Sequence, residues 1–225
     1  DTMHKLGEQT SELCPKARYE FAMHGEPTAH PEWERMIRIL RSYLPKAQFQ
    51  LTTNGRTWMR DLQAGVDKAW AAGVDIIILD TYEPERTRLQ KKAKELMGCD
   101  VRDFYNDCLP NKWSPWSNHR RKVRKTLVVM DDIGERSGES KSRTLMNHAG
   151  NSGSEPSTKR PMKRTCTIPF REVSVCFNGA VNICCMDWGH EYTCGNINET
   201  SLKEIWHGPE FTAARRILFQ RDRVF

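Results

Sequence analysis

The chain has 225 residues, enough for one large domain or for one domain with a small additional module. It holds no run of roughly eighteen apolar residues and does not open on a signal peptide, so neither a transmembrane helix nor a secreted protein is expected. Its eight cysteines, without a secretory signal, favour metal or redox use over disulfides in a reducing, cytoplasmic setting.

The net charge of +6 is concentrated in two basic runs, residues 118–125 and 159–164. Such runs can contact phosphates, but a solvated surface is the simpler explanation for them. A nucleic-acid partner is therefore not expected, although RNA binding through these runs remains a third hypothesis.

The first half of the chain alternates between patterns of strand and helix. Residues 1–17 are weakly patterned and could form a helix that leads into the first strand. Phe21, Phe49 and Ile77 are each 28 residues apart, which is typical of βαβ units with parallel strands. The expected strands are 18–23, 48–52, 74–79, 101–105 and 126–130, and the expected helices are 33–44, 62–70 and 85–97.

Polar residues follow the ends of these expected strands. They are Glu26, then Thr53 and Asn54, then Asp80, with Asp131 a further candidate. Ligands bind at the carboxyl ends of strands in α/β folds, because loops and helix N-termini offer free donors there. The sequence therefore predicts a binding site at this edge. The long segment 106–125 is interpreted as a substrate-side loop, and 131–163 as a loop-rich bridge.

The last third of the chain contains a β-hairpin pattern that is rich in cysteine. Alternating apolar residues on both sides of Asn178-Gly179 predict two strands joined by a type I′ turn, which would pair Cys176 with Val181. Cys176 and Cys185 would then lie roughly 13 Å apart on one face, too far for a disulfide. Thiols that cannot easily cross-link favour metal or cluster ligation.

Two helices are expected after the hairpin. Ser201 and Glu204 have the spacing of a capping box, which predicts a helix that packs on the hairpin. Pro209 is expected to open a further helix. Both helices are interpreted as structural, with no part in chemistry.

The cysteine-rich segment resembles a known module. Cys166, twelve residues, Gly179, four residues and Cys184, followed by Gly195-Asn196 and the stretch 201–206, are similar to the SPASM/twitch motif of radical S-adenosylmethionine (radical SAM) enzymes. The resemblance implies an auxiliary iron–sulfur cluster with Cys166 and Cys184 as ligands. Cys185 and Cys194 are possible further ligands, and zinc is an alternative occupant of the same four thiols. Cys176 is interpreted as a small core residue.

The resemblance extends to the strand ends. Gly25-Glu26-Pro27 looks like the family's Gly-Glu motif, which binds the amino group of S-adenosylmethionine. A carboxylate suits an ammonium group, since charge-assisted hydrogen bonds are strong. Thr53-Asn54 and Asp80 resemble the family's polar residues at the next two strand ends. The family's serine before that aspartate is absent here.

One departure from the family is large. The Cys-x3-Cys-x2-Cys loop that holds the family's catalytic [4Fe–4S] cluster does not occur in the residues given. The family's distal Cys-x2-Cys element would begin near Phe225. The expectation is a fragment cut at both ends, which as given could not cleave S-adenosylmethionine.

These observations combine into one prediction. The fold would be α/β, a partial (β/α)-barrel over 1–135, a linker over 136–163, and an incomplete SPASM/twitch-like hairpin-helix module over 164–225. By resemblance, the intact enzyme would form a 5′-deoxyadenosyl radical at a [4Fe–4S] cluster and modify a peptide or small molecule, with a flavodoxin- or ferredoxin-type reductant. The alternative is a non-catalytic binding module with a structural zinc or iron–sulfur site.

Overall fold

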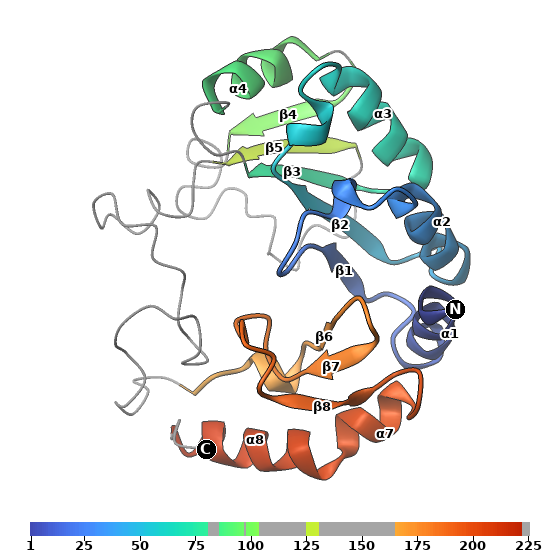
Figure 1. Cartoon of the computed structure of the whole chain (residues 1–225), viewed down its shortest axis with the longest axis vertical. Coiled ribbons are helices and arrows are strands. Elements are labelled where there is room, and N and C mark those ends of the chain that lie inside the picture. The colour runs from blue at the N-terminus through green and yellow to red at the C-terminus, as the bar shows by residue number, and fades with distance from the viewer. Residues whose placement is uncertain (81–85, 97, 104–124, 131–164, 222–225) are drawn as a thin grey trace. The chain divides into compact units, whose positions relative to one another are not determined.

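The computed structural model describes residues 1–80, 86–96, 98–103, 125–130 and 165–221 (Figure 1). The expectations for Asp131, for the bridge 131–163 and for all but Lys125 of the loop 106–125 and the two basic runs lie outside these residues. By its internal contacts the chain divides into two compact units. One is Cys14–Ser142, and the other combines Asp1–Leu13 with Arg143–Phe225.

The first unit is built on a parallel sheet of five strands, in the order β1-β2-β3-β5-β4. Phe21 pairs with Leu51, Leu51 with Ile77, and Ile77 with Leu127, so one row of apolar residues crosses four strands. This confirms the predicted α/β fold with parallel strands. The strands are β1 (Arg18–Phe21), β2 (Gln48–Thr53), β3 (Ile76–Asp80), β4 (Asp100–Asp103) and β5 (Thr126–Met130).

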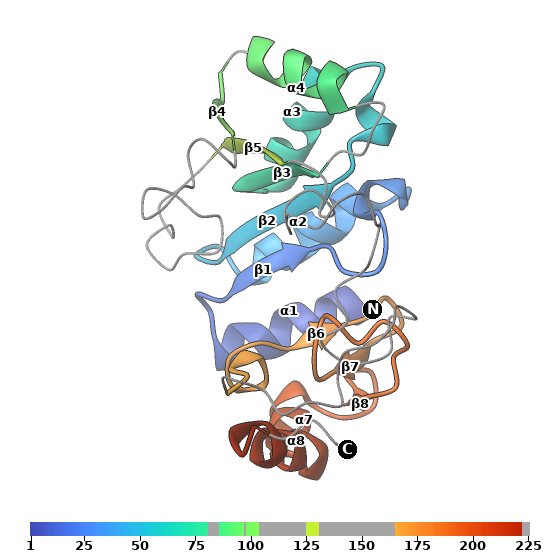
Figure 2. The same ribbon diagram turned by 90° about the vertical axis from the view of Figure 1, so that its left-hand side faces the viewer.

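Helices line one face of this sheet, as Figures 1 and 2 show. In the first of them the residues Trp33, Ile37 and Leu40 are buried, at the helical spacing that the sequence displays. Asp61 caps the second helix by accepting a hydrogen bond from Ala64 N. The elements are α2 (Trp33–Tyr43), α3 (Leu62–Ala72), α4 (Arg86–Glu95) and the short 3₁₀ turns η1 (Pro27–Ala29) and η2 (Arg56–Trp58).

The order of the strands in the sheet differs from their order in the chain at one place, which the sequence pattern does not reveal. β5 pairs with β3 in the interior of the sheet, while β4 pairs only with β5 and forms the edge of the described sheet. All five residues of β5 are buried, whereas Val101 and Arg102 of β4 are only half-buried. The continuous apolar run of β5 is thus explained by cover on both faces.

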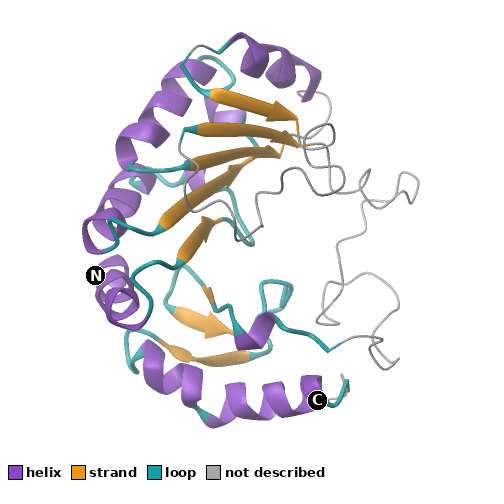
Figure 3. Ribbon diagram, turned by 180° about the vertical axis from the view of Figure 1, so that it is seen from behind, coloured by secondary structure: helices purple, strands orange, loops and turns teal. Residues whose placement is uncertain are grey.

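The second unit contains a three-stranded antiparallel sheet with helices beside it (Figure 3). The capping box is present as predicted, with Ser201 and Glu204 each accepting from the other's backbone. The predicted hairpin with a following helix is therefore confirmed. The elements are α1 (Thr2–Leu13), η4 (Ile168–Phe170), β6 (Ser174–Val175), β7 (Ala180–Asn182), β8 (Thr193–Asn196), α7 (Leu202–His207) and α8 (Pro209–Phe219).

The hairpin register differs from the predicted one by a residue. Val175 pairs with Val181, and Cys176 N donates to Ala180 O. Gly179 N donates to Cys176 O, and Gly179 has a φ of 86°. This is a three-residue loop closed by a left-handed glycine, so the predicted type I′ turn with Cys176 opposite Val181 is wrong. An Asn-Gly pair serves both turns, because glycine supplies the positive φ in either.

The N-terminal helix exists, but it belongs to the second unit. Lys5 Nζ donates to Asn198 O at 2.9 Å, and Gln9 Oε1 accepts from Leu202 N at 2.5 Å. Residues 1–13 are therefore grouped differently from the predicted barrel range 1–135. The predicted boundaries at 135 and 163 lie in residues that are not described and stay a prediction.

Among the described residues, no helix is both long enough and apolar enough to cross a membrane.

Candidate functional site

Three predicted polar residues lie at one edge of the parallel sheet. Glu26 follows β1, Asn54 follows β2, and Asp80 is the last residue of β3. These strands are parallel neighbours, so their carboxyl ends meet. Asp80 is buried, with 8% of its surface exposed. The edge therefore carries two carboxylates and an amide from three different strand ends.

Glu26 connects the first two strand ends directly. Its Oε1 accepts from Thr28 N at 3.0 Å, from Thr28 Oγ1 at 2.6 Å and from Thr53 Oγ1 at 2.7 Å. Its Oε2 accepts from Asn54 N at 2.7 Å. The side chain thus fixes its own loop and joins that loop to the end of β2.

Hydroxyl groups set the direction of these hydrogen bonds. Thr28 has one hydroxyl proton, which Glu26 accepts, so Thr57 must donate in the 2.6 Å contact between the hydroxyls of Thr28 and Thr57. Thr53 likewise donates to Glu26 and accepts from Gly55 N at 3.1 Å. Sequence reasoning missed Thr28 and Thr57, because threonines have no distinctive spacing here.

The backbone before Glu26 is unusual. Met23 has a φ of 88°, a left-handed conformation that is uncommon outside glycine and that concentrates at ligand sites. A Cβ on Gly25 would meet no atom within 4 Å, so the backbone there borders open space. Pro27 begins η1, where its fixed φ suits the first helical position.

Three cysteines of the second unit influence one another. Cys184 shares a hydrogen bond with Cys185, and this contact together with burial raises the pKa of the Cys184 thiol well above its ordinary value; nearby Cys166 adds to the effect. Met186 N donates to Cys184 Sγ at 3.3 Å. The structure therefore brings Cys166, Cys184 and Cys185 into one neighbourhood.

Cys194 lies in a different environment. Burial and the charge of Glu210 raise the pKa of its thiol to about 11, and Arg215 acts against that rise. Its Sγ donates to Tyr192 O at 3.7 Å. The predicted fourth ligand is therefore surrounded by groups of β8 and α8, while the other three sulfurs influence one another.

The loop between these cysteines is fixed by a buried carboxylate. Asp187 has none of its surface exposed, and its two oxygens accept from Glu191 N at 3.0 Å and from Tyr192 N at 2.9 Å. Asp187 N in turn donates to Cys184 O at 3.2 Å. Asp187 thus holds the segment from Cys184 to Tyr192 in one shape.

Cys176 has a polar partner instead of an apolar core. Its Sγ lies 3.4 Å from His190 Nδ1, and that nitrogen lies 2.8 Å from Asn182 Nδ2. Burial raises the pKa of the Cys176 thiol, and Asp187 adds to this. The prediction of a small core residue is therefore wrong, since the side chain is half-buried and lies at hydrogen-bond distance from His190.

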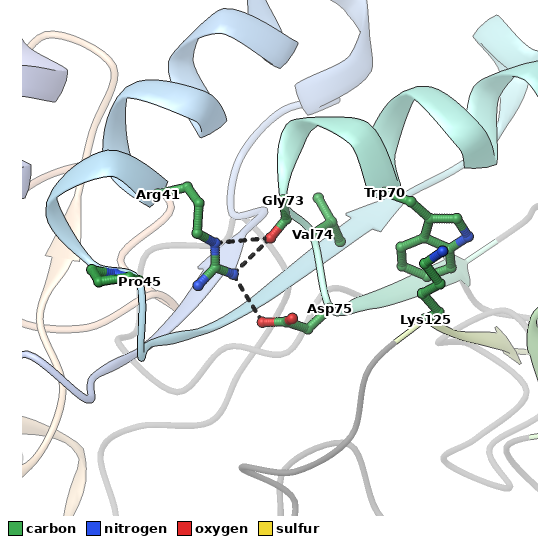
Figure 4. Close-up of a pocket in the computed structure, with 7 residues that line it drawn as sticks. All are labelled: Arg41, Pro45, Trp70, Gly73, Val74, Asp75 and Lys125. Carbon is green, nitrogen blue, oxygen red and sulfur yellow. Dashed lines mark hydrogen bonds and ion pairs between the residues drawn. The ribbon is translucent and has the colours of Figure 1, made fainter.

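A separate pocket lies near the amino ends of β2 and β3 (Figure 4). Its volume is about 410 Å³. Arg41 spans it and donates to Gly73 O and to Asp75 Oδ2, the latter at 2.9 Å. Arg41 and Asp75 are thus paired with each other as a structural ion pair. The lining residues are Arg41, Pro45, Trp70, Gly73, Val74, Asp75 and Lys125.

Comparison with known proteins decides between the possible readings of the cysteines. Residues 166–224 match the family model of the SPASM iron–sulfur cluster-binding domain. The S-adenosyl-L-methionine-dependent 2-deoxy-scyllo-inosamine dehydrogenase of Niallia circulans is 22% identical over 218 residues, which cover 97% of this chain and 73% of that protein. The chain contains a SPASM domain, and it resembles a radical SAM enzyme over nearly its whole length.

Solved structures agree with this assignment at the level of the fold. The structure of BtrN in complex with AdoMet and 2-DOIA has a TM-score of 0.67 and 21% identity, over 96% of this chain and 72% of that one. BtrN in an open conformation has a TM-score of 0.60 and 18% identity, over 96% and 71%. The predicted family, its enzyme class and its iron–sulfur cofactor are confirmed.

The cysteines fit the iron–sulfur chemistry of a radical SAM/SPASM protein in part. Thiolates are the ligands that these clusters take, and the N–H···S bond from Met186 is of the kind that tunes them. Among the described residues, however, no group of three or more Cys, His, Asp or Glu side chains stands at metal-binding distance. The three neighbouring thiols would have to lose their protons and draw together on binding.

The strand edge fits the amino acid part of S-adenosylmethionine, from which the radical SAM family takes its name. A carboxylate offers about four acceptor positions, and Oε2 of Glu26 uses one of its own for Asn54 N. Oε2 can therefore accept from an ammonium group, beside the open backbone at Gly25.

Proposed function

We propose that this chain binds S-adenosylmethionine at the carboxyl edge of its parallel sheet. It would serve radical chemistry on a small molecule in an intact enzyme that also has the Cys-x3-Cys-x2-Cys loop, which the residues given do not contain. The proposed binding residues are Gly25, Glu26, Pro27, Thr53, Asn54 and Asp80. The observation that carries the proposal is the pair of hydrogen bonds that Glu26 accepts from Thr53 Oγ1 and Asn54 N, because they join two predicted motifs that are separate in the sequence.

Glu26 has two tasks in this proposal. Its Oε1 holds the loop and the end of β2 together, while its Oε2 receives the ammonium group of the bound methionine moiety. The donors from Thr28 and Thr53 fix the carboxylate before the ligand arrives, which lowers the ordering cost of binding. When bound at an iron–sulfur cluster, S-adenosylmethionine supplies the 5′-deoxyadenosyl radical in this family.

The second unit would hold the auxiliary cluster. Cys166, Cys184 and Cys185 are proposed as ligands because their sulfurs influence one another, and Cys194 is proposed as the fourth. The proposal keeps the predicted domains, which are the partial barrel over 1–135, the linker over 136–163 and the SPASM/twitch-like module over 164–225. We also propose a flavodoxin- or ferredoxin-type reductant and a cytoplasmic location for the intact enzyme.

The substrate proposed is a small polar molecule in preference to a peptide. The support is the similarity to a dehydrogenase of 2-deoxy-scyllo-inosamine, which extends over 97% of this chain. We propose dehydrogenation as the reaction type on the same basis. No residue is assigned a catalytic role.

The test is binding of S-adenosylmethionine, measured by isothermal titration under anaerobic conditions with the full chain. Glu26→Gln removes the charge and should weaken binding about tenfold or more, the value of a hydrogen bond to a charged group. Glu34→Gln, on α2 of the same unit, is the matched control and should bind as the parent does.

Two outcomes contradict the proposal. Equal affinity of Glu26→Gln and the parent would remove Glu26 from the site. A parent that takes up zinc but no iron and sulfide on anaerobic reconstitution, and that does not bind S-adenosylmethionine, would favour the non-catalytic binding module.

A further inference from the structure

Arg215 of α8 is held on three sides inside the second unit. Its Nε donates to Pro169 O at 2.8 Å, and its Nη1 donates to Trp206 O at 2.6 Å. Its guanidinium carbon lies 4.1 Å from the centroid of the Trp206 ring and 5.0 Å from that of Phe211. The side chain therefore has a fixed position and a fixed direction.

The third nitrogen of this guanidinium differs from the two that donate hydrogen bonds. Arg215 Nη2 is buried and has no hydrogen-bond partner among the residues that the structure describes. Within the same part of the chain no carboxylate forms an ion pair with Arg215. An unpaired buried donor on a charged group is costly, so a missing acceptor of negative charge is the simplest explanation.

The surroundings of Arg215 indicate what this acceptor is. The electrostatic neighbour of its charge is the half-buried thiol of Cys194 in β8. Pro169, whose carbonyl fixes Nε, follows Cys166 by three residues. Arg215 thus contacts the segment that follows Cys166 and interacts electrostatically with Cys194.

We propose that Arg215 is the positively charged neighbour of the auxiliary iron–sulfur cluster, with Nη2 as a hydrogen-bond donor to a cluster sulfur or a ligating thiolate. This inference rests on the proposed function, because it presumes a cluster on these cysteines. A thiolate-bound cluster is negatively charged, and hydrogen bonds to its sulfurs help to set its reduction potential. Arg215 stabilises the reduced form more, since that form carries one more negative charge.

Arg215 is a positioning residue in this account, and it acts in two ways. Its bond to Pro169 holds the segment behind Cys166 against α8, so that the ligand is placed before the cluster assembles. Its charge then raises the midpoint potential of the assembled cluster. The two effects separate in experiment, because the first changes cluster occupancy and the second changes the potential.

The test uses the full chain, reconstituted anaerobically with iron and sulfide. Arg215→Met removes the charge at similar length, and Arg215→Lys keeps the charge without the planar fork. Arg216→Met removes the same charge from the adjacent, exposed position of α8 and is the matched control. Iron and sulfide are quantified, and the midpoint potential is measured by a redox titration followed by electron paramagnetic resonance.

The midpoint potential of Arg215→Met should be more negative than that of the parent, with Arg215→Lys between them and Arg216→Met unchanged. A parent-like potential in Arg215→Met at parent-like iron content overturns the inference and leaves the proposed function intact. If Arg215→Met does not fold, a parent-like potential and iron content in Arg215→Lys overturn it instead. A parent that takes up no cluster overturns the proposed function and this inference with it.

Discussion

Asp75 shows how a single buried carboxylate fixes the edge of the parallel sheet at which β2 and β3 begin. Its side chain is 6% exposed, and it accepts from Arg41 Nη2 and from Phe49 N, both at 2.9 Å. Arg41 also lies over the Phe49 ring, with its guanidinium carbon 3.8 Å from the ring centroid. A buried ion pair contributes little in net terms, but the loss of one partner leaves the other charge uncompensated.

Asp75→Asn should therefore destabilise the first unit by about 3 kcal/mol. The amide can still accept from Phe49 N, so the expected loss comes from the unpaired Arg41. Chemical denaturation measures it, and Asp67→Asn on the exposed side of α3 is the control. A loss for Asp75→Asn no larger than for this control would show that Arg41 finds enough compensation in its backbone carbonyls.

Glu204 gives a prediction for the pH dependence of stability. Hydrogen bonds from the side chain and the backbone of Ser201 lower the pKa of Glu204 from its ordinary value of 4.5. A carboxyl whose folded pKa is lowered contributes stability above its ordinary pKa, and the contribution is lost as the pH falls through the folded pKa.

Glu204→Gln should therefore melt at a lower temperature than the parent at about pH 7, and the difference should shrink toward about pH 3. Thermal unfolding followed by circular dichroism across this range measures it. Glu199→Gln, which is also exposed and lies just before the helix, is the control. If the difference in melting temperature is the same in acid as at neutral pH, glutamine destabilises the helix start for a reason other than the lost charge.

At the scale of elements, α3 packs against η2 through a glycine. Trp58 is 6% exposed, and a Cβ built on Gly65 would lie 2.3 Å from its ring. Glycine is otherwise unfavourable in a helix by about 1 kcal/mol relative to alanine. Packing against Trp58 thus requires a glycine at position 65, although glycine is unfavourable in a helix.

Gly65→Ala should destabilise the protein by about 1–3 kcal/mol despite the gain in propensity, because the ring of Trp58 must move. Ala71→Gly, exposed on the same helix, measures propensity alone and is the control. Trp58→Leu in the Gly65→Ala background should recover part of the loss, as seen by chemical denaturation. If Gly65→Ala stabilises the chain, the close approach of Trp58 is not a constraint.

At the scale of the whole molecule, the first helix belongs to the unit formed by the end of the chain. Gln9 supplies an acceptor for Leu202 N at the start of α7, and Lys5 donates to Asn198 O. The first N–H groups of a helix have no partner within it, so this acceptor satisfies one of them. These two hydrogen bonds connect the start of the chain to its last third, and each joins residues that are 193 positions apart in the sequence.

The double variant Lys5→Met, Gln9→Leu should increase hydrogen exchange in α7 and leave β2 and β3 unchanged. Each lost hydrogen bond corresponds to about 1 kcal/mol. Hydrogen exchange followed by mass spectrometry measures both regions in one experiment, and Glu8→Gln on the exposed side of α1 is the control. Equal acceleration in β2 and β3 would show that the two units unfold together.

The sequence by itself determined the parts of this protein that depend on near neighbours. The spacing of Phe21, Phe49 and Ile77 predicted parallel strands, the apolar run before Asp80 predicted a buried one, and the Ser201–Glu204 pair predicted a helix start. Such features are decided by backbone propensity and by one apolar face, which a few residues specify. The same patterns located the polar strand ends and the cysteine module.

Only the tertiary structure decided which of these residues meet. It placed β5 beside β3, shifted the hairpin by one residue at Gly179, and joined α1 to α7. It also supplied the partners that sequence motifs omit, such as Thr57 behind Glu26 and Arg215 beside Cys194. These contacts cross long stretches of chain, and each depends on the packing of the complete unit, so no local pattern can specify them.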